Sequence, residues 1–276
     1  MPVFSVYSSP TLLFRHLTDE NPDDSFFQMH IHEQFEILYF VSGSAQCLVE
    51  TSSYRMMPDT LMLMRPMESH RINILGREPY ERYTINFSAE LVDAVDPERS
   101  LLAPFYDRRL GEKNMYRASE LDIHPHKLFS AMQPHTETES SRRTEILTYF
   151  FALLGQLGSA FAVKKGEPVP DRNTLANEIA GYINEHLFQE LSLRIVADTF
   201  YISVSQLNRI FRNSTGFSVW DYVTGKRLAA ARSRIREGMP ATRAFAACGF
   251  NDYSSFYRLH LKKFGVTPKQ DFEKKL

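Results

Sequence analysis

The chain has 276 residues, of which 43% are hydrophobic and 24% are charged, and this predicts a globular protein of two domains with sizeable cores. We expect no membrane-spanning helix, because no apolar stretch approaches the roughly 18 residues that such a helix needs, and no secretory signal in residues 1–10. The two cysteines, Cys47 and Cys248, lie in different predicted domains, so we expect no disulfide framework and a cytoplasmic protein.

Charge is distributed unevenly along the chain. Residues 172–276 contain 16 basic and 9 acidic residues, whereas residues 1–171 contain 16 basic and 24 acidic residues. A basic C-terminal part attached to an acidic N-terminal part predicts that only the C-terminal part binds a polyanion. Charge alone does not identify that polyanion as a nucleic acid.

The first hundred residues predict short β-strands. Runs rich in β-branched and aromatic residues alternate with turn residues, which is typical of a sandwich or a small barrel. We expect strands at residues 35–41, 45–50, 60–64 and 80–87.

The period changes to a helical one from about residue 121. Residues 144–161 place apolar side chains at spacings of three and four, which predicts an amphipathic helix. We expect its apolar face to cover the β domain. The alternative is pairing with the same helix of a second chain, which would make the protein a homodimer.

Residues 164–172 form the predicted linker between two domains, residues 1–163 and 173–276, because they are polar and contain Gly166, Pro168 and Pro170. The second domain is expected to be all helical, with Asn173 as the first N-cap and with helices ending at Gly216, Gly238 and Gly265. The expected helices cover residues 175–186, 192–200, 203–214, 219–237, 240–248, 253–264 and 268–274.

The helical region repeats itself at an offset of 49 residues. The matching pairs are Ala197 and Ala246, Ser205 and Ser254, Leu207 and Phe256, Arg209 and Arg258, Gly216 and Gly265, and Ser218 and Thr267. Each copy has the pattern of a helix-turn-helix, at residues 192–214 and 240–264. Ala197 and Ala246 would be the small residues where the two helices cross, and residues 201–203 and 249–251 would be the turns.

The second helix of each copy combines an apolar stripe with a polar, cationic face. We expect Leu207, Ile210 and Phe211 to be buried in one copy, and Phe256, Leu259, Leu261 and Phe264 in the other. The candidate DNA-binding residues are Ser203, Ser205, Gln206, Asn208, Arg209, Arg212, Asn251, Tyr253, Ser254, Tyr257, Arg258 and Lys262. Arginine and asparagine read base edges, while serine and lysine more often hold phosphates. Solvated faces of a generic helical bundle are the alternative, but two copies on a basic domain favour DNA binding.

Residues 219–237 would join the two copies as one helix of about 28 Å. Because successive major grooves on one face of DNA lie about 34 Å apart, one chain could place both second helices in adjacent grooves.

The run SLRIVADTFYISVSQLNRIFRNSTG from Ser192 and the run AACGFNDYSSFYRLHLKKFGVTP from Ala246 resemble the DNA-binding domain of the AraC/XylS family of bacterial regulators. The resemblance implies double-stranded DNA and RNA polymerase as partners. It also implies that base contacts come from Ser205, Asn208, Arg209, Tyr253, Ser254, Tyr257 and Arg258.

The run HIHEQFEILYFVSG resembles the first motif of cupin domains, and PDTLMLMRPMESHRIN resembles the second, although Asp59 stands where a glycine is usual. If a strand presents His30 and His32 on one face, they could converge with Glu36 and His70 on a divalent transition metal. The favoured interpretation is a metal-free pocket for a small ligand such as a sugar. Its candidate residues are His30, His32, Glu36, His70, Arg15, Arg82 and Asn86.

The sequence thus predicts a multidomain α and β protein, with an N-terminal cupin-like β-barrel or jelly roll carrying a helical hairpin and a C-terminal domain with two helix-turn-helix units. We expect a ligand-responsive transcription activator, not an enzyme, that regulates carbohydrate or related metabolism, needs no cofactor and binds a small-molecule effector. One alternative is a metal-dependent cupin enzyme fused to a helical domain. The other is a DNA-binding protein that responds to no ligand.

Overall fold

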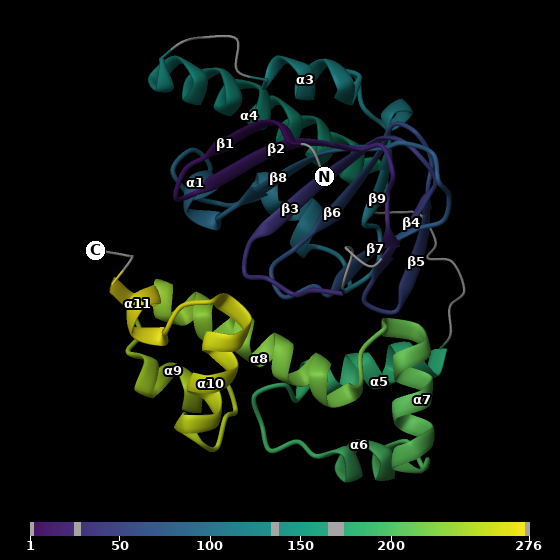
Figure 1. Cartoon of the computed structure of the whole chain (residues 1–276), viewed down its shortest axis with the longest axis vertical. Helices are drawn as coiled ribbons and strands as arrows, with labels where there is room; N and C mark the ends of the chain where they lie inside the picture. The colour runs from purple at the N-terminus through teal and green to yellow at the C-terminus, as the bar shows by residue number, and fades with distance from the viewer. Residues whose placement is uncertain (1–2, 25–28, 134–137, 165–173, 274–276) are drawn as a thin grey trace. The chain divides into compact units, whose positions relative to one another are not determined.

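The computed structural model describes residues 3–24, 29–133, 138–164 and 174–273, which form two compact units (Figure 1). The first unit comprises residues 1–28 and 34–170, and the second comprises Met29–Glu33 and residues 171–276. Of the predicted linker 164–172, only Lys164 lies among the described residues, at the end of a helix, and the predicted N-cap Asn173 lies outside them.

The first unit is built on two antiparallel sheets, with strand orders β1-β2-β8-β3-β6-β9 and β5-β4-β7. The strands are β1 (Val3–Ser8), β2 (Leu12–Asp19), β3 (Phe35–Ser42), β4 (Ala45–Val49), β5 (Ser52–Met56), β6 (Thr60–Met64), β7 (His70–Ile74), β8 (Tyr80–Phe87) and β9 (Met115–Arg117). The four expected strands are confirmed as β3, β4, β6 and β8. The patterns of the other five were not recognised in the sequence.

Strand β3 explains why this unit has two cores. Its odd-numbered residues, such as Ile37 and Tyr39, belong to the core that includes the helices, and its even-numbered residues, such as Leu38 and Phe40, belong to the core shared with β4 and β7. Successive side chains of a strand point to opposite faces. A strand that is buried on both faces therefore reads as a continuous apolar run.

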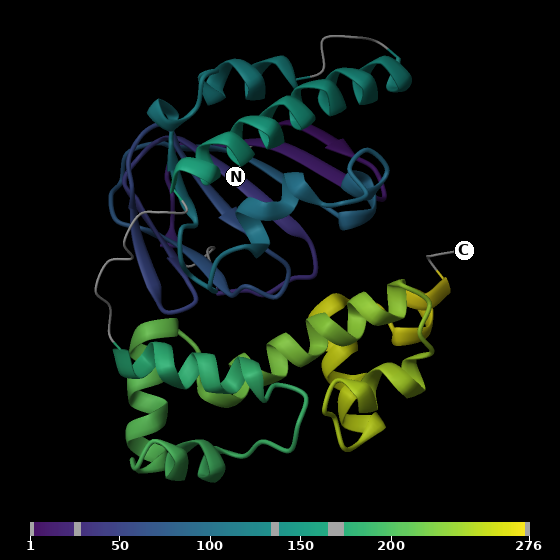
Figure 2. The same cartoon turned by 180° about the vertical axis from the view of Figure 1, so that it is seen from behind.

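The helices of the first unit are α1 (Ala89–Asp93), α2 (Ala103–Tyr106), α3 (Pro125–Ala131) and α4 (Glu139–Lys164), with short 3-10 turns at η2 (Ser100–Leu102) and η3 (Ala118–Glu120). Helices α3 and α4 lie on the same side of the larger sheet (Figure 2). The expected amphipathic helix is therefore present, and it is longer than the predicted residues 144–161.

Helix α4 corrects one expectation from composition. Its 26 residues include an 18-residue window with a mean hydropathy of 1.7, so by length and composition alone it could cross a membrane. The expectation that no stretch reaches this limit was wrong. In the structure, Phe150, Leu153 and Leu157 of α4 are buried in the core with the larger sheet, and a core helix meets the same criterion.

A buried ion pair between Glu68 and Arg108 fixes the turn that precedes β7. The two carboxylate oxygens of Glu68 lie 2.7 Å from Nη1 and Nη2 of Arg108, and both side chains are 0% exposed. Burial alone would raise the pKa of Glu68, but the Arg108 charge and hydrogen bonds from Arg108 and from the backbone N–H groups of Gly111 and Arg65 lower it to about 2.

The second unit contains only helices among its described elements, and their bounds agree with the expected ones to within two residues. They are α5 (Thr174–Glu185), α6 (Leu193–Thr199), α7 (Val204–Thr215), α8 (Val219–Arg236), α9 (Ala241–Ala247), α10 (Tyr253–Phe264) and α11 (Pro268–Glu273). Ser192, Ser203 and Ser218 cap α6, α7 and α8 by accepting backbone hydrogen bonds. Gly216 and Gly265 end α7 and α10 at φ angles of 77° and 69°.

Replacing Glu68 with Gln should destabilise the first unit by about 3–5 kcal/mol near neutral pH, because Arg108 would stay buried without an opposite charge. The folded-state pKa of Glu68 lies below its ordinary value of 4.5, so the contribution is complete above that value and is lost as the pH falls towards 2. Urea unfolding should therefore show a gap between wild type and Glu68→Gln that narrows with acidification. Exposed Glu98→Gln is the control, and equal stability of the two variants would contradict the prediction.

Candidate functional site

Each copy of the repeat is a pair of helices, α6 with α7 and α9 with α10. The second helices are related by the predicted offset of 49 residues, but the first helices are related by 48, from Leu193–Thr199 to Ala241–Ala247. The expectation for Ala246 was therefore wrong. Ala246 is exposed, and Ala244 is the buried small residue of the second copy, as Val196 and Ala197 are buried in the first.

The extra residue of the second copy lies in its turn. Residues 200–203 connect α6 to α7, whereas residues 248–252 connect α9 to α10. Both turns contain a residue with left-handed backbone geometry, Tyr201 with φ 56° and Gly249 with φ 79°. The Tyr201 side chain is 96% exposed, so packing of its ring does not stabilise this unfavourable backbone conformation.

Helix α7 presents Ser205, Arg209 and Arg212 to solvent. Two other predicted DNA-binding residues are engaged within the helix: Ser203 and Gln206 form a capping box, in which each side chain accepts a hydrogen bond from the backbone N–H of the other.

Asn208 has a structural contact that the sequence did not indicate. Its Oδ1 accepts a hydrogen bond from the backbone N–H of Val219, the first residue of α8, at 3.3 Å, and its Nδ2 donates to the Val204 carbonyl. The residue is only half-buried. Asn208 therefore connects α7 to α8, and its amide is partly committed to that role.

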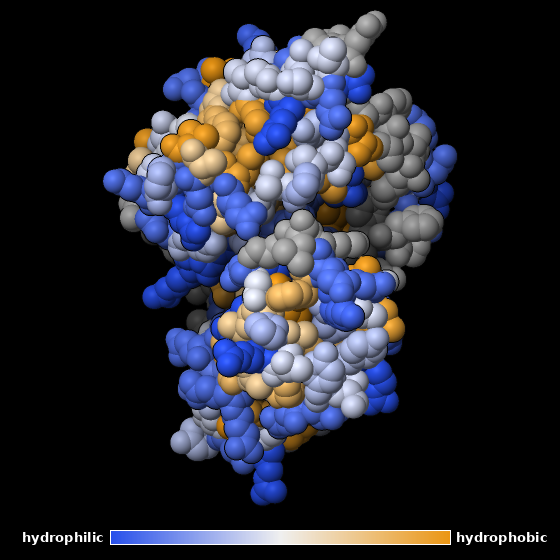
Figure 3. Space-filling model, turned by 90° about the vertical axis from the view of Figure 1, so that its left-hand side faces the viewer, coloured by the Kyte–Doolittle hydropathy of each residue, from blue (hydrophilic) through white to orange (hydrophobic). Residues whose placement is uncertain are grey.

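A hollow of about 490 Å³ lies beside α7, where α8 begins. It is lined by Leu193, Asn208, Arg209, Arg212, Asn213, Ser218 and Trp220. Two arginines and the N-terminus of α8 give this hollow a positive potential. Hydrophilic residues also make up most of the helical unit's surface on the face drawn in Figure 3, with smaller hydrophobic areas between them.

Helix α10 presents Ser254, Tyr257, Arg258 and Lys262 to solvent, and Asn251 is exposed in the preceding turn. Tyr253 is half-buried and packs edge-on against Phe245, with ring centroids 5.3 Å apart. In the predicted apolar stripe, Phe256 is buried, Leu259 and Phe264 are half-buried, and one residue needs a correction. Leu261 is 40% exposed, and the adjacent residue His260 is buried in its place, with its Nδ1–H donating to the Val266 carbonyl.

Arg227 of α8 forms hydrogen bonds to both halves of the second unit, and the sequence did not indicate this role. Its guanidinium donates to the backbone carbonyls of Leu187 at 2.7 Å, Gln189 at 2.8 Å and Gly249 at 2.5 Å. Leu187 and Gln189 precede α6, and Gly249 lies in the turn of the second copy. One buried side chain therefore ties the start of the first helix-turn-helix and the turn of the second to the same helix.

In the first unit, four of the candidate ligand-binding residues form one polar chain. Arg15 of β2 donates from Nη2 to Oδ1 of Asn86 at 3.0 Å, and Asn86 of β8 donates from Nδ2 to Oε2 of Glu36 at 2.9 Å. Nε2 of His70, on β7, lies 3.6 Å from the same oxygen of Glu36. The side chains of Glu36, His70 and Asn86 are buried, so the chain crosses the inner space between the two sheets.

His70 has a defined orientation. Its Nδ1 lies 2.9 Å from the carbonyl oxygen of Glu68, which can only accept, so Nδ1 carries a hydrogen and Nε2 is the nitrogen that faces Glu36. Burial lowers the pKa of His70, but the hydrogen bond and charge of Glu36 outweigh burial and raise it.

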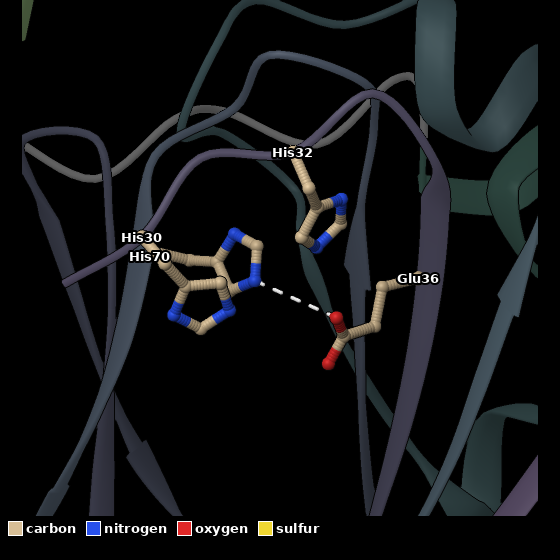
Figure 4. A group of neighbouring side chains, drawn as sticks. All are labelled: His30, His32, Glu36 and His70. Carbon is tan, nitrogen blue, oxygen red and sulfur yellow. Dashed lines mark ion pairs between the residues drawn. The ribbon is translucent and has the colours of Figure 1, made fainter. Parts of the chain in front are cut away.

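His30 and His32 complete a group that we call the His–Glu cluster: His30, His32, Glu36 and His70. One potential ligand atom from each residue lies within 4.8 Å of the others, and the three imidazole rings gather beside the Glu36 carboxylate (Figure 4). The strand expected to present the two histidines is absent, because His30 is an isolated bridge residue and His32 has no regular structure. His30 is also exposed.

Arg82, Thr84 and Asn86 occupy alternate positions of β8. The Nη1 of Arg82 donates to the hydroxyl of Tyr80 at 3.2 Å. Its charge also acts on the chain of Arg15 and Asn86. Burial lowers the pKa of Arg15, and the nearby charge of Arg82 lowers it further, against the opposite effect of Glu36.

Asp59, the departure from the cupin pattern, has a φ of 64°. This left-handed conformation explains why glycine is usual at the position. The Tyr39 hydroxyl donates a hydrogen bond to the Asp59 carboxylate.

Comparison with known proteins agrees with both halves of this description. Residues 13–154 match the family model of the AraC-like ligand binding domain, and residues 196–274 match that of a helix-turn-helix domain. The probable transcriptional regulator LumQ of Photobacterium leiognathi is 30% identical over 245 residues, which cover 87% of this chain and 89% of LumQ. The transcriptional activator RhaS of Enterobacter sp. (strain 638) is 23% identical over 254 residues, which cover 88% of this chain and 87% of RhaS.

A solved structure of ToxT from Vibrio cholerae aligns with 96% of each chain at 12% identity, with a TM-score of 0.41. The curated relatives LumQ and RhaS are transcriptional regulators, not enzymes, which argues against the alternative of a metal-dependent cupin enzyme. The family model of the ligand-binding domain alone spans more than half of the chain. The chain therefore belongs to the AraC family of transcriptional regulators, with a ligand-binding domain followed by a helix-turn-helix DNA-binding domain.

Proposed function

We propose that this regulator binds a small hydroxylated effector, of the sugar class, between the two sheets of its first unit, and reads DNA with α7 and α10. The observation that carries the proposal is the buried polar chain from Arg15 through Asn86 and Glu36 to His70. Buried polar groups in a sheet interior stabilise a fold less than apolar side chains of the same size would. Their presence there favours a binding role.

Two atoms beside this chain support a hydroxylated effector. Nε of Arg15 and Oγ1 of Thr84 are buried and make no hydrogen bond to the residues that the structure describes. The strand register places Arg15 directly opposite Thr84. A ligand hydroxyl can both accept from the guanidinium and donate to the threonine oxygen. The apolar core beyond, which includes Met62 and Met64, would contact the carbon skeleton.

On the DNA side, we propose that Arg209 and Arg258 contact bases, because both are exposed at matching positions of the two second helices. We assign Ser203 and Gln206 a lesser role than the sequence predicted, since they cap α7. The residues proposed to accompany the two arginines are Ser205, Asn208, Arg212, Asn251, Tyr253, Ser254, Tyr257 and Lys262.

A second candidate for the first unit is a divalent transition metal in the His–Glu cluster. Three imidazoles and one carboxylate are a suitable donor set for such an ion. The orientation of His70 also fits, because a metal-binding histidine usually donates its other ring N–H to a carbonyl or carboxylate, as Nδ1 does to Glu68. The ion would supply a fixed positive charge opposite Glu36, and His30, His32, Glu36 and His70 would hold it.

We further propose that the protein acts as a homodimer and as an activator that contacts RNA polymerase in the cytoplasm. For the dimer, Tyr149 and Val163 of α4 are 36% and 80% exposed, and a Cβ at Gly155 or Gly158 would meet nothing within 4 Å. For activation, the support is the similarity to RhaS, which is a transcriptional activator. Regulation of carbohydrate or related metabolism follows from the proposed effector class.

Arg209→Ala and Arg258→Ala should each weaken binding to the preferred duplex by about 1–3 kcal/mol, and should relax sequence preference, if the two side chains read bases. The duplex would be selected from a random library by the wild-type protein, and affinities measured at fixed salt concentration. Lys269→Ala, which removes one charge from α11, is the control. Equal losses on every sequence would reduce the two arginines to phosphate contacts.

The full chain should be stabilised by one member of a panel of monosaccharides and sugar acids. An effector at 100 times its dissociation constant adds about 2.7 kcal/mol. This amounts to a rise in Tm of roughly 5–10 °C for a domain of this size. Asn86→Ala should abolish the rise, and Asn21→Ala should retain it. A rise that persists in Asn86→Ala would place the effector elsewhere.

If the His–Glu cluster holds a metal ion, the dialysed protein should bind one equivalent of Co²⁺. His32→Ala and His70→Ala should each weaken binding by at least tenfold, in line with the loss of a ligand or of its support. Mass spectrometry of bound metal and visible absorption of Co²⁺ measure the stoichiometry and the ligand field. His126→Ala, an exposed histidine on α3, should bind Co²⁺ like the wild type. Binding that His70→Ala leaves unchanged would exclude this site.

A further inference from the structure

Arg15 lies on the face of the larger sheet that is turned towards the smaller sheet. Strand β2 places it directly opposite Thr84 of β8, and Thr84 lies opposite Leu38 of β3. Leu38 belongs to the core that β3 shares with β4 and β7, and residues directly opposite each other on paired strands share a face. The side chain of Arg15 therefore brings a positive charge to the region between the two sheets.

The hydrogen-bond acceptor of this guanidinium is a neutral group. Nη2 of Arg15 donates to Oδ1 of Asn86 at 3.0 Å, and Nε is buried without a hydrogen bond to any described residue. Glu36 is held on the other side of the same amide, where its Oε2 accepts from Nδ2 of Asn86 at 2.9 Å. The carboxylate of Glu36 thus acts on Arg15 across an amide, and a half-buried guanidinium is left with an unused donor.

A second guanidinium adds to the positive charge on this face. Arg82 lies two residues before Thr84 on β8, so Arg82 and Arg15 are diagonal neighbours. Nη1 of Arg82 donates to the hydroxyl of Tyr80 at 3.2 Å, a contact that contributes no negative charge. Burial lowers the pKa of Arg15, and the charge of Arg82 lowers it further, against the opposite effect of Glu36. The two arginines therefore repel each other, and a bound anion would offset that repulsion.

We propose that the effector is a sugar acid, whose carboxylate binds Arg15 beside Thr84. The inference rests on the effector site proposed above and narrows its ligand class. A carboxylate matches the planar donor geometry of a guanidinium, and such charge-assisted hydrogen bonds are about twice as strong as bonds between neutral groups. Nε of Arg15 supplies the unused donor, and the buried Oγ1 of Thr84 would accept from an adjacent sugar hydroxyl. A phosphate, with a charge of about −1.5 to −2 at pH 7, would be repelled more strongly by Glu36.

Matched series of ligands test the charge of the effector on the full chain. The series are neutral hexoses, the uronic and aldonic acids that correspond to them, and their phosphate esters. Isothermal titration calorimetry at fixed pH and ionic strength measures the affinities. One sugar acid should bind about 10-fold or more tightly than its neutral parent, because a hydrogen bond to a charged group is worth more than one to a neutral group. The corresponding phosphate ester should bind more weakly than the acid.

Variants of Arg15 test its role through the ratio of the two affinities, for the acid and for its neutral parent. Arg15→Gln keeps N–H donors but removes the charge, and should lower the ratio by about 10-fold or more. Arg15→Lys keeps the charge and should retain part of the preference for the acid. A general loss of packing would weaken both ligands alike and leave the ratio unchanged. Arg55→Gln, at an exposed position of β5, is the matched control and should bind like the wild type.

The outcomes separate this inference from the proposed function. A neutral hexose that binds as tightly as its acid, with binding lost in Asn86→Ala, would leave the effector site standing and overturn the acidic class. Tighter binding of the phosphate ester would overturn the carboxylate. A preference for the acid that Arg15→Gln leaves unchanged would overturn the assignment of Arg15. If the wild type binds no compound of any series, the proposed effector and the inference both fail.

Discussion

The second unit depends on the position of Arg227, because this one side chain holds parts of both helix-turn-helix units on α8. Its three hydrogen bonds go to backbone carbonyls on both sides of α8. A buried guanidinium is costly unless its donors are used, and here they are used by the segments that must be held. Helix α8, with 18 residues, is about 27 Å long. It can therefore act as a spacer of nearly one DNA turn only if both units are fixed to it.

The first unit shows how one strand can support both a core and a site. The odd-numbered residues of β3 pack against the core that includes the helices, and its even-numbered residues pack between the sheets. Glu36 lies in the even-numbered series, near the start of the strand. There the apolar interior gives way to Asn86, His70 and Arg15. The polar chain is therefore held by the same backbone that builds the core, which fixes the relative positions of its groups.

The sequence predicted the elements that repeat or alternate, and missed those held by backbone contacts. The bounds of helix α10 were predicted residue for residue, because its helical spacing of apolar residues ends at Gly265. The role of Arg227 could not be recognised from the sequence, because its partners are backbone carbonyls, which every residue type carries. The burial of His260 in place of Leu261 was missed, because a buried histidine needs a hydrogen-bond acceptor. Only the fold supplies that acceptor, the Val266 carbonyl.

The candidate sensor site was predicted in part, and for the same reason. Glu36 and Asn86 follow strand alternation, so their meeting with Arg15 could be expected from residue pattern. The way in which His30 and His32 reach the His–Glu cluster could not be expected from the residue pattern, because the two histidines lie outside any regular strand.

The unequal turns of the two helix-turn-helix units give the protein a polarity. The first copy has Ser205 and Arg209 behind a turn of four residues, and the second has Tyr257 and Arg258 behind a turn of five. A single chain thus presents two unlike helix surfaces in a fixed order. With the base contacts proposed above, it would occupy an asymmetric sequence in one direction only. The direction of the DNA site would then determine the orientation of the regulator towards a transcription start, even without a second subunit.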